Sequence, residues 1–404
     1  VGFVPSHPHR VCRRLSFLHS LLHTTSVPVP SSNLDALHPS PDTIRAFHTD
    51  LLAWYDRNKR EMPWRDIDDP YKTWVSEIML QQTRVDTVRD YYRRFLAEFP
   101  TVEALAAADR DAVLKQWEGL GYYSRARYLH EAAQQVVSEH GGTVPRTWDA
   151  IRDLKGIGPY TAAAVLSIAY EEPHAVLDGN VIRVLTRIFA VDDDSTTTRT
   201  KRHLRRIANE LIEPTRPGDF NQAMMELGAT VCTPRSPSCA ECPVAGVCDA
   251  HAMESETDYP VTPESKPIPH HDIAVGLVFD DDGCLLIQRR PDEGLLGGLW
   301  EFPGGKREAD ESLEDACIRE LHEEVGITVA VDAPFATIKH AYSHFKITLY
   351  AFRCHVEEGE ASSKEGQPLK WVLPEALEDY AFPRANRRLI EELERRAKEP
   401  SLFD

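Results

Sequence analysis

The hydrophobic pattern of this 404-residue chain changes its period once, and that change constrains the fold more than any other feature. From residue 43 to about residue 230, apolar side chains recur every three or four positions, as Ile44, Phe47 and Leu51 do. This spacing puts them on one face of a helix, and no strand signal interrupts it. We therefore expect the first half of the chain to fold as an all-α domain.

The second half follows a different pattern. Residues 251–269 contain four prolines and no periodicity, which predicts an interdomain linker. Two β-rich runs at 273–279 and 284–288 then flank an Asp-Asp-Asp-Gly turn, which is typical of a hairpin. A helix near 312–324 and further strands follow. We therefore predict a separate α/β domain at 270–404.

Composition excludes several classes of protein. With 42% hydrophobic and 27% charged residues, the chain is too apolar to be mostly disordered, and its length fits two domains of roughly 150 to 200 residues. No apolar run reaches the about 18 residues of a membrane-spanning helix, so we expect no membrane partner. The formal net charge is -18, so any nucleic acid must be bound by a local surface rather than by the overall field.

Residues 1–42 differ from the rest of the chain. They contain several arginines, prolines and histidines, and Asp35 is the first acidic residue. An organelle transit peptide has such a composition. We favour an unstructured extension or a misassigned start, because the sequence begins with Val1 rather than methionine. We accordingly expect a cytoplasmic, nucleoid-associated protein, with an organelle as the alternative.

Four of the eight cysteines lie within 17 residues, in the pattern C-x6-C-x2-C-x5-C. Prolines between them predict a loop rather than a core element. Four thiolates at this density bind a soft metal, and the spacing leaves both zinc and an iron–sulfur cluster open. The other cysteines are too sparse for a disulfide scaffold, which indicates a reducing compartment. The four candidate ligands are Cys232, Cys239, Cys242 and Cys248.

Two acids and one turn are candidates for chemistry. Glu77 lies within the apolar stretch WVSEIML, where burial would raise the pKa of its carboxyl and suit it to general-acid catalysis, although a solvated helix residue would also fit. Asp178 opens a helical stretch, where it could be a plain N-cap. Gly156 and Gly158 permit a tight turn and expose the N–H groups of the next helix to a phosphate, or form an ordinary helical turn.

These motifs together carry a family resemblance. The segments SEIMLQQT, GLGYYSRAR, LKGIGPYTAAAV, LDGNVIRVL, FNQAMMELGA and the cysteine loop occur in this order between residues 43 and 250. In this order they resemble the adenine DNA glycosylase family of the helix-hairpin-helix superfamily. The resemblance implies an all-α helix-hairpin-helix glycosylase domain, a [4Fe–4S] cluster on the four cysteines, and double-stranded DNA as the partner.

The resemblance also assigns the chemistry. Glu77 would protonate the leaving adenine, and ionised Asp178 would stabilise or capture the oxocarbenium-like sugar. Tyr160 and Asn180 would hold the sugar and Asp178 in position. Related bifunctional enzymes place a lysine at the position of Tyr160, and its amine forms a Schiff base with the sugar. Since tyrosine cannot do this, we predict a monofunctional enzyme that leaves an abasic site.

Contacts with DNA follow from the same resemblance. The target base must leave the duplex, so side chains must fill the gap and hold the opposite strand. Gln82 and Tyr122 would be these wedging residues, and the hairpin of Gly156 and Gly158 would meet the backbone. For Trp64, core packing is the alternative. The residues expected to line the adenine pocket are Arg60, Met62, Trp64 and Arg65.

The C-terminal domain carries a complete Nudix box, G-x5-E-x7-R-E-L-x-E-E-x-G-I, from Gly305 to Ile327. On a helix, Glu320, Glu323 and Glu324 would share the inward face with apolar residues. Inward carboxylates are costly unless a cation joins them, and Mg²⁺ takes oxygen ligands. The sequence therefore predicts a magnesium site on these three glutamates.

The glycosylase family has a C-terminal domain that resembles a Nudix hydrolase and reads 8-oxoguanine, generally with the box degraded. In this chain Ser343 and His344, within AYSHF, resemble the family's lesion-reading element. The family therefore predicts a monomer that excises adenine opposite 8-oxoguanine. The intact box predicts a second activity, Mg²⁺-dependent hydrolysis of oxidised nucleoside triphosphates, and the alternative is a relic box on a domain that only reads the lesion. The alternatives are a Nudix pyrophosphohydrolase with a DNA-targeting helical domain, a pyrimidine-specific lyase, and a non-catalytic lesion sensor.

Overall fold

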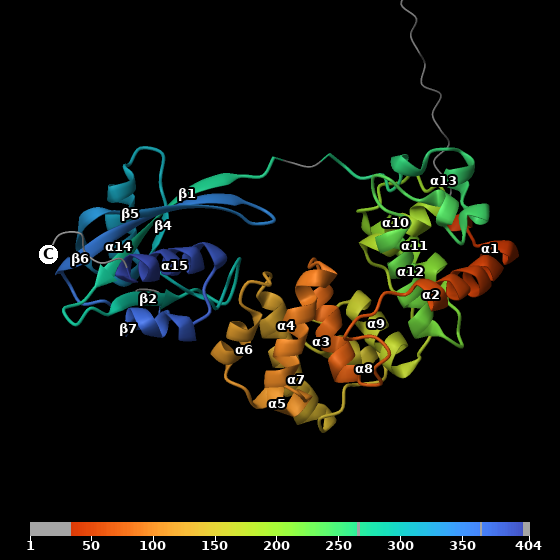
Figure 1. The fold of residues 1–404 in the computed structure, drawn as a ribbon, viewed down its shortest axis with the longest axis horizontal. Coiled ribbons are helices and arrows are strands. Elements are labelled where there is room, and N and C mark those ends of the chain that lie inside the picture. Colours follow the sequence, from red (N-terminus) through yellow and green to blue (C-terminus); the bar gives the residue numbers. More distant parts are fainter. Residues whose placement is uncertain (1–33, 265–266, 364–365, 399–404) are drawn as a thin grey trace, which may run out of the picture.

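The structure is a computed structural model that describes residues 34–264, 267–363 and 366–398. Figure 1 shows two bodies, one built from helices by the first part of the chain and one in which helices pack on a sheet. The expected fold class, an all-α domain followed by an α/β domain, is confirmed.

The segment 34–42, which we expected to belong to an unstructured extension, is ordered at both of its ends. Leu34 is fully buried, and its carbonyl oxygen accepts a hydrogen bond of 3.1 Å from Arg206. Helix α1 begins within the same segment (Pro41–Ala46). Part of the expected extension therefore belongs to the packed fold, and residues 1–33 lie outside the described residues.

The helical domain is a succession of short helices joined by tight turns. Their bounds are η2 (Phe47–Leu51), α2 (Leu52–Asn58), α3 (Pro70–Leu80), α4 (Val85–Glu98), α5 (Val102–Ala107), α6 (Arg110–Trp117), α7 (Ser124–His140), α8 (Trp148–Asp153), α9 (Pro159–Tyr170), α10 (Gly179–Ile188), α11 (Thr198–Leu211), α12 (Pro217–Thr230) and α13 (Asp249–Ala252). The apolar faces predicted by the three-to-four-residue period point inward, as burial of apolar surface requires.

Two hydrophobic clusters form the core of this domain. The first surrounds Trp74 and Trp117 and belongs to helices α3 to α7, whereas the second surrounds Phe220 and belongs to η2, α2 and α10 to α12. Helix α9 contributes to both clusters, with Val165 in the first and Ala164 in the second. The domain therefore has two lobes that share one helix.

The C-terminal domain is an α/β structure, and in the described part of the chain its strands form one seven-stranded sheet. The element bounds are β1 (His270–Phe279), β2 (Leu285–Arg289), β3 (Trp300–Glu301), β4 (Gly304–Lys306), α14 (Leu313–Val325), β5 (Thr328–Ala341), β6 (Lys346–Glu358), β7 (Leu369–Val372), η6 (Pro374–Asp379) and α15 (Arg384–Lys398). The expected hairpin is β1–β2, with Phe279 opposite Leu285.

The two faces of this sheet are covered by different helices. The strand order is β3-β2-β1-β6-β5, with β1 and β6 parallel, β4 paired with β1, and β7 paired with β2. Side chains alternate along β1, so that Val278 packs with Leu321 of α14 and Leu277 packs with Leu389 of α15. The Nudix-box helix α14 therefore covers one face, and α15 covers the other.

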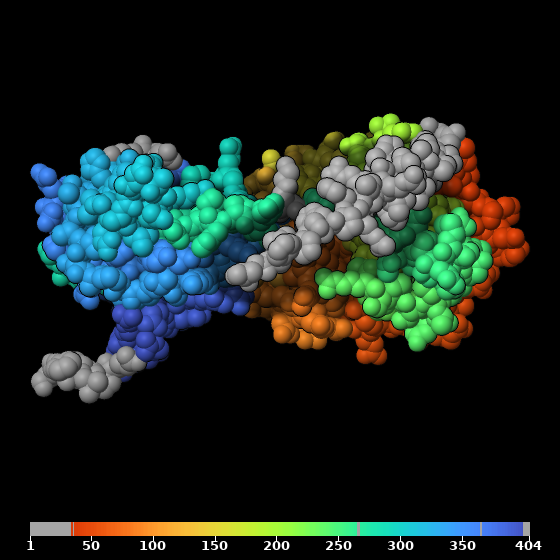
Figure 2. Space-filling model, turned by 90° about the horizontal axis from the view of Figure 1, so that it is seen from above, coloured from red at the N-terminus to blue at the C-terminus, as the bar shows by residue number. Residues whose placement is uncertain are grey.

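The two domains contact each other through apolar and polar side chains. Leu299 and Ala381 of the C-terminal domain pack into the first hydrophobic cluster of the helical domain. Arg127 of α7 donates hydrogen bonds to the carbonyl oxygens of Asp292, at 2.5 Å, and of Gly297, in the loop between β2 and β3. Glu118 forms a 2.9 Å ion pair with Arg387 of α15. Figure 2 shows the blue C-terminal domain lying against the orange part of the helical domain. These contacts hold the β2–β3 loop against helix α7.

The first part of the expected linker is fixed to the helical domain. The hydroxyl and the N–H of Ser195 both donate to the carbonyl oxygen of Val261, at 2.9 and 3.0 Å. A short helix, η5 (Glu256–Asp258), precedes this contact. No helix in the described ranges is both long and apolar enough to cross a membrane.

Candidate active site

Glu77 lies in the middle of helix α3, on a side that the fold buries. The helix begins at Pro70 after the N-cap Asp69, and the residues around Glu77 pack into the first hydrophobic cluster, which leaves its side chain 4% exposed. Tyr160, in the first turn of α9, donates a 2.6 Å hydrogen bond to Glu77 Oε2. The structure thus brings together two predicted site residues from different helices.

The surroundings of Glu77 favour its protonated form. Burial raises the pKa of its carboxyl to about 7, and the charge of Asp178 adds to this effect. The hydrogen bond from Tyr160 and the charge of Arg65 act in the opposite direction. A carboxyl whose pKa lies near neutrality can carry a proton and release it at working pH, as a general acid must.

Asp178 is both an N-cap and a member of the same site. Its Oδ1 accepts the Val181 N–H at 2.7 Å, and its Oδ2 accepts the amide of Asn180 at 2.9 Å. Burial raises the pKa of Asp178, and these hydrogen bonds counteract the rise. The Asp178 charge acts on both Glu77 and Tyr160. The N-cap interpretation and the catalytic one are therefore compatible, because one oxygen caps α10 and the charge reaches Glu77.

Asn180 connects this site to the cysteine loop. Arg183 donates to Asn180 Oδ1 and to the backbone carbonyl of Cys232, each at 2.8 Å. Asn180 in turn donates to Asp178. Three consecutive hydrogen bonds therefore join the first cysteine of the loop to the carboxylate at the start of α10.

The four expected adenine-pocket residues separate into two kinds. Arg60 and Arg65 both bind the carboxylate of Glu226, with N–O distances of 2.6 and 2.7 Å. Although burial raises the pKa of Glu226, their hydrogen bonds bring it below its ordinary value. Trp64 is buried against Tyr92 in an edge-to-face contact, as expected for a core residue. Met62 packs partly buried against the same cluster.

Sequence reasoning missed Glu226, which has the same signal as Glu77: an acid inside an apolar helical segment, AMMELGA. Its side chain is only 2% exposed, and the sulfur of its neighbour Met225 lies 3.5 Å from the Tyr160 hydroxyl. The second arginine partner, Arg65, also acts on Glu77. The carboxylate of Glu226 therefore belongs to the same polar centre.

The two expected wedging residues occupy strained turns. Gln82 has φ 57° and Tyr122 has φ 48°, a left-handed conformation that is uncommon for residues with a side chain. Arg125 joins the two turns, because its guanidinium donates to the carbonyl oxygens of Met79, at 3.0 Å, and Gly121, at 3.0 Å. Sequence analysis did not single out Arg125, most of whose hydrogen-bond partners are backbone carbonyl oxygens, together with the Thr83 hydroxyl.

The two turns face the C-terminal domain across a cleft of about 310 Å³. Gln82 and Tyr122 line one side, and Ser343 and His344 line the other. The rings of Tyr122 and His344 lie 6.1 Å apart in an edge-to-face arrangement. The structure therefore brings the expected wedging residues and the expected lesion-reading residues to one cleft.

The hairpin glycines have different roles. Gly156 has φ +74°, and a Cβ at this position would lie 2.5 Å from the Tyr128 side chain, so the turn requires glycine. Gly158 is the N-cap of α9, and a Cβ there would meet nothing within 4 Å. Its openness leaves the start of α9 accessible to an anion.

The four cysteines of the loop line one small void, together with Arg187. Arg187 is buried and lies 3.2 Å from Cys232 Sγ. Burial raises the pKa of Cys239 to about 12 and that of Cys242 to about 11, so these thiols would hold their protons in the absence of a metal. Four converging thiols with a cationic neighbour fit an iron–sulfur cluster, which replaces the protons with iron.

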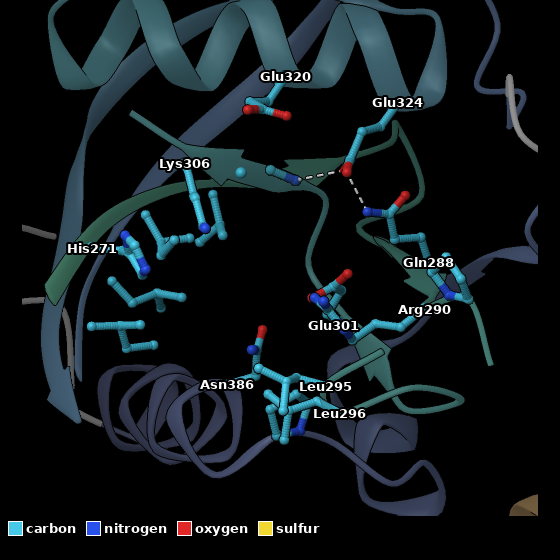
Figure 3. A pocket seen from close by; sticks show the side chains of 18 of the residues that line it. His271, Gln288, Arg290, Leu295, Leu296, Glu301, Lys306, Glu320, Glu324 and Asn386 are labelled. Atoms are coloured by element: carbon cyan, nitrogen blue, oxygen red, sulfur yellow. Dashed lines mark hydrogen bonds and ion pairs between the residues drawn. The ribbon is translucent and has the colours of Figure 1, made fainter. Parts of the chain in front are cut away.

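The Nudix-box carboxylates border a larger cavity of about 760 Å³. Arg319 binds Glu311 at 2.7 Å, and also Glu320 and Glu323, each at 3.0 Å. Figure 3 shows Glu320 and Glu324 directed from α14 toward the cavity. Glu323 lines the cavity as well, but its side chain is 55% exposed, so only two of the three expected carboxylates lie clearly inward.

Glu324 is held in place and is strongly affected by its neighbours. Its Oε2 accepts hydrogen bonds from Gln288 at 2.5 Å and from the Gly304 N–H at 3.2 Å. Burial raises the pKa of Glu324 to about 7, and the charge of Glu301 contributes. A Cβ on the first box glycine, Gly305, would lie 2.3 Å from the Glu320 carboxyl and would displace it. Crowded carboxylates of this kind fit a divalent cation.

Comparison with known proteins agrees with this arrangement. Residues 75–210 match the HhH-GPD superfamily of base excision DNA repair proteins, 232–248 match the iron–sulfur binding domain of endonuclease III, and 274–392 match the NUDIX domain. The fold and the site thus define a DNA glycosylase of the base excision repair class. The iron–sulfur match decides between the two metals that the cysteine spacing left open: the loop carries a [4Fe–4S] cluster.

The relatives narrow this class. The adenine DNA glycosylase of Mus musculus is 38% identical over 374 residues, which cover 79% of this chain and 72% of that protein. The adenine DNA glycosylase of Homo sapiens is 36% identical over 403 residues, which cover 86% of this chain and 74% of that protein. The chain belongs to the adenine DNA glycosylase family.

Proposed function

We propose that this enzyme excises adenine paired with 8-oxoguanine, with Glu77 as the general acid. The observation that carries the proposal is the 2.6 Å hydrogen bond between Tyr160 and a buried Glu77 that also experiences the charge of Asp178. Cleavage of a glycosidic bond needs one carboxyl that donates a proton and one that remains charged. Glu77 would be the carboxyl that donates the proton, and Asp178 the one that remains charged.

The proton passes from Glu77 to a ring nitrogen of the departing adenine. Asp178 remains ionised, because Asn180 and Val181 hydrogen-bond its two oxygens, and its charge stabilises the sugar cation. Water then adds to C1′ of the sugar cation, and its proton returns to the Glu77 carboxylate. Tyr160 positions Glu77 and offers no amine, so the reaction ends at an abasic site. Buried Glu226, with Arg60 and Arg65, gives the centre fixed hydrogen-bonding groups for the purine edge.

The cleft between the domains supports recognition of the opposite base. Ser343 and His344 face Gln82 and Tyr122 there, so a base left behind by the extruded adenine would meet polar groups from the C-terminal domain. A single chain supplies both sides, which supports action as a monomer on duplex DNA. When bound, the [4Fe–4S] cluster supplies the iron–thiolate bonds that close residues 232–248 next to Arg183 and Arg187.

The test is base release from duplexes that carry adenine opposite 8-oxoguanine, G, C or T, each with and without alkali. We expect adenine release to be fastest opposite 8-oxoguanine and strand breaks to appear only after alkali. The double variant S343A/H344A should lose the preference for 8-oxoguanine over G while retaining base release. Strand cleavage without alkali, or an unchanged preference in the double variant, would contradict the proposal.

A second activity is favoured by the intact Nudix box around the 760 Å³ cavity. Glu320 and Glu324 would hold Mg²⁺, which supplies charge neutralisation for a phosphoanhydride. Water would cleave an oxidised nucleoside triphosphate to the monophosphate and pyrophosphate. The test incubates 8-oxo-dGTP with Mg²⁺ and measures both products, with E324Q as the variant. An equal rate in E324Q would assign the hydrolysis to another source.

A further inference from the structure

The Nudix-box cavity and the interdomain cleft are separated by a single layer of side chains. Leu295 and Leu296, from the β2–β3 loop, line both spaces. Tyr342, His344 and Phe345, from the β5–β6 turn, also line both. We call these five residues the shared wall. Whatever fills one space therefore touches the same side chains as whatever fills the other.

The shared wall closes the end of the cavity opposite the carboxylates. In Figure 3, Leu295 and Leu296 lie across the cavity from Glu320 and Glu324, with Asn386 beside the two leucines. A nucleotide whose phosphates approach Glu320 and Glu324 through a cation would therefore place its base at the wall. The cavity itself orients the ligand.

Asn386 identifies this end as a site for a base. Its side chain belongs to α15, is 5% exposed, and points into the cavity. Its Oδ1 accepts the Phe302 N–H at 3.3 Å, and among the described residues no hydrogen bond is made by its Nδ2. The amide of Asn386 lines the cavity, so its Nδ2 can donate a hydrogen bond to a base bound there. Tyr342 and Phe345, whose stacked rings lie 4.7 Å apart, provide an apolar surface beside it.

The shared wall is fixed at the base of the β2–β3 loop and exposed at its tip. Arg127 fixes the base of the loop through the carbonyl oxygens of Asp292 and Gly297. At the tip, Leu295 is 57% exposed, whereas Leu296 packs against the first hydrophobic cluster. On the other side His344 touches Tyr122. A base that pushes the wall toward the cleft therefore reduces the space in which the lesion would be read.

We propose that a purine nucleoside phosphate with Mg²⁺ in the cavity and 8-oxoguanine DNA in the cleft bind antagonistically through the shared wall. The free oxidised nucleotide would thereby lower the enzyme's affinity for the lesion duplex. This inference rests on the proposed lesion-reading role of the cleft and on the proposed cation site. By linkage, the duplex must weaken nucleotide binding by the same factor.

The experiment uses the full-length, cluster-containing enzyme and 8-oxo-dGMP with Mg²⁺, a ligand that has no phosphoanhydride to hydrolyse. The duplex carries 2′-fluoro-2′-deoxyadenosine, whose glycosidic bond resists cleavage, opposite 8-oxoguanine or G. We expect saturating 8-oxo-dGMP to raise the Kd of the 8-oxoguanine duplex about tenfold, which is about 1.4 kcal/mol, and that of the G duplex less than twofold. An equal concentration of dCMP controls for ionic strength and Mg²⁺.

The reciprocal measurement needs no variant. The Kd of 8-oxo-dGMP for the free enzyme and for the enzyme saturated with the 8-oxoguanine duplex should differ by the same factor. In N386L, which removes the amide from the cavity, the effect of 8-oxo-dGMP on duplex affinity should disappear. Absence of nucleotide binding, an unchanged duplex Kd, or equal weakening of both duplexes would overturn the antagonism.

A failure of the proposed lesion-reading role can be distinguished from a failure of the antagonism. The preference for 8-oxoguanine and its dependence on Ser343 and His344 are measured without nucleotide. A preference that survives in S343A/H344A removes the lesion-reading role. A lost preference, combined with nucleotide binding that leaves the duplex Kd unchanged, removes only the antagonism.

Discussion

The two acidic centres of this molecule both contain a carboxyl with a raised pKa, but their residues are brought together in different ways. In the glycosylase site, Glu77 and Asp178 come from distant parts of the sequence. They come within electrostatic reach because α3 packs on α9, α9 on α12, and α12 on α10. In the C-terminal domain, Glu320 and Glu324 are one turn apart on a single helix. Burial raises the pKa of both Glu77 and Glu324 to about 7. A raised carboxyl pKa therefore does not by itself identify a proton donor.

What separates the two centres is the partner of the carboxyl. Glu77 accepts a hydrogen bond from a tyrosine hydroxyl and has one charged carboxylate nearby, which suits proton donation. Glu324 is surrounded by Glu301 and Glu320, which a cation would relieve. The groups around a carboxyl, more than the size of its pKa shift, therefore decide whether it serves as a proton donor or as a metal ligand.

The largest predicted effect is on adenine release, when Glu77 or Glu324 is replaced by glutamine. E77Q should lower single-turnover adenine release by about 10³-fold, because a positioned proton donor contributes about 10² to 10⁴. E324Q should leave adenine release within threefold of the wild type. Quenched-flow base release from the 8-oxoguanine duplex measures both, and duplex binding by E77Q serves as the control. A slow E324Q together with a fast E77Q would reverse the assignment.

The next effect concerns stability and its dependence on pH. The folded-state pKa of Glu77 lies near 7, above its ordinary 4.5, so wild-type stability should fall as pH rises from about 4.5 to 7. E77Q lacks this penalty. It should be more stable than the wild type by at most about 3 kcal/mol at pH 8, and by little at pH 4.5. Denaturant unfolding at both pH values measures the difference, and an advantage that does not change with pH would contradict it.

A smaller effect tests how the domains are held together. R127A should leave the buried carbonyl oxygen of Gly297 without its donor, at about 1–3 kcal/mol, and should also remove the donor to the more exposed carbonyl oxygen of Asp292, and so loosen the β2–β3 loop. We expect the preference for 8-oxoguanine over G to fall about tenfold, while release opposite G changes little. R93A removes an exposed arginine paired within α4 and is the matched control. Equal losses opposite both bases would assign Arg127 a general structural role.

The smallest predicted effect is the loss of stability on removing one exposed ion pair. Arg146 and Glu172 form an exposed ion pair with an N–O distance of 3.0 Å. Exposed pairs contribute about 0–1 kcal/mol, so R146A should change the free energy of unfolding by less than about 0.5 kcal/mol. Denaturant unfolding at two salt concentrations measures it. A loss above 1 kcal/mol would mean that surface pairs stabilise this fold more than expected.

The sequence was informative wherever the chemistry is local. The change of hydrophobic period gave the fold class, and the cysteine spacing gave a metal loop. The box spacing placed Glu320 and Glu324 on the inward side of one helix, but it also placed Glu323 there, whose side chain is 55% exposed. A helical arc has a width, and a residue at its edge can point to solvent.

The remaining features depend on packing between distant segments. No spacing pairs Glu77 with Asp178, so only the family resemblance joined them. Glu226, Arg125 and Arg127 went unnoticed because their partners are a remote arginine pair or backbone carbonyl oxygens. Leu34 lies in a segment whose composition predicts an unstructured extension, but its buried side chain and the hydrogen bonds from Arg206 to the carbonyl oxygens of Leu34 and Leu37 hold it on the helical domain.

Helix α9 supplies residues to both hydrophobic clusters and carries Tyr160 at its first turn. Because α9 packs against both lobes, it connects them mechanically. Any twist of one lobe against the other must turn or bend it, and the tyrosine hydroxyl would be carried away from Glu77. The position of the Tyr160 hydroxyl relative to Glu77 therefore depends on how the two lobes pack against α9. Substitutions that only change the packing around Ala164 or Val165 should lower turnover before they lower the free energy of unfolding.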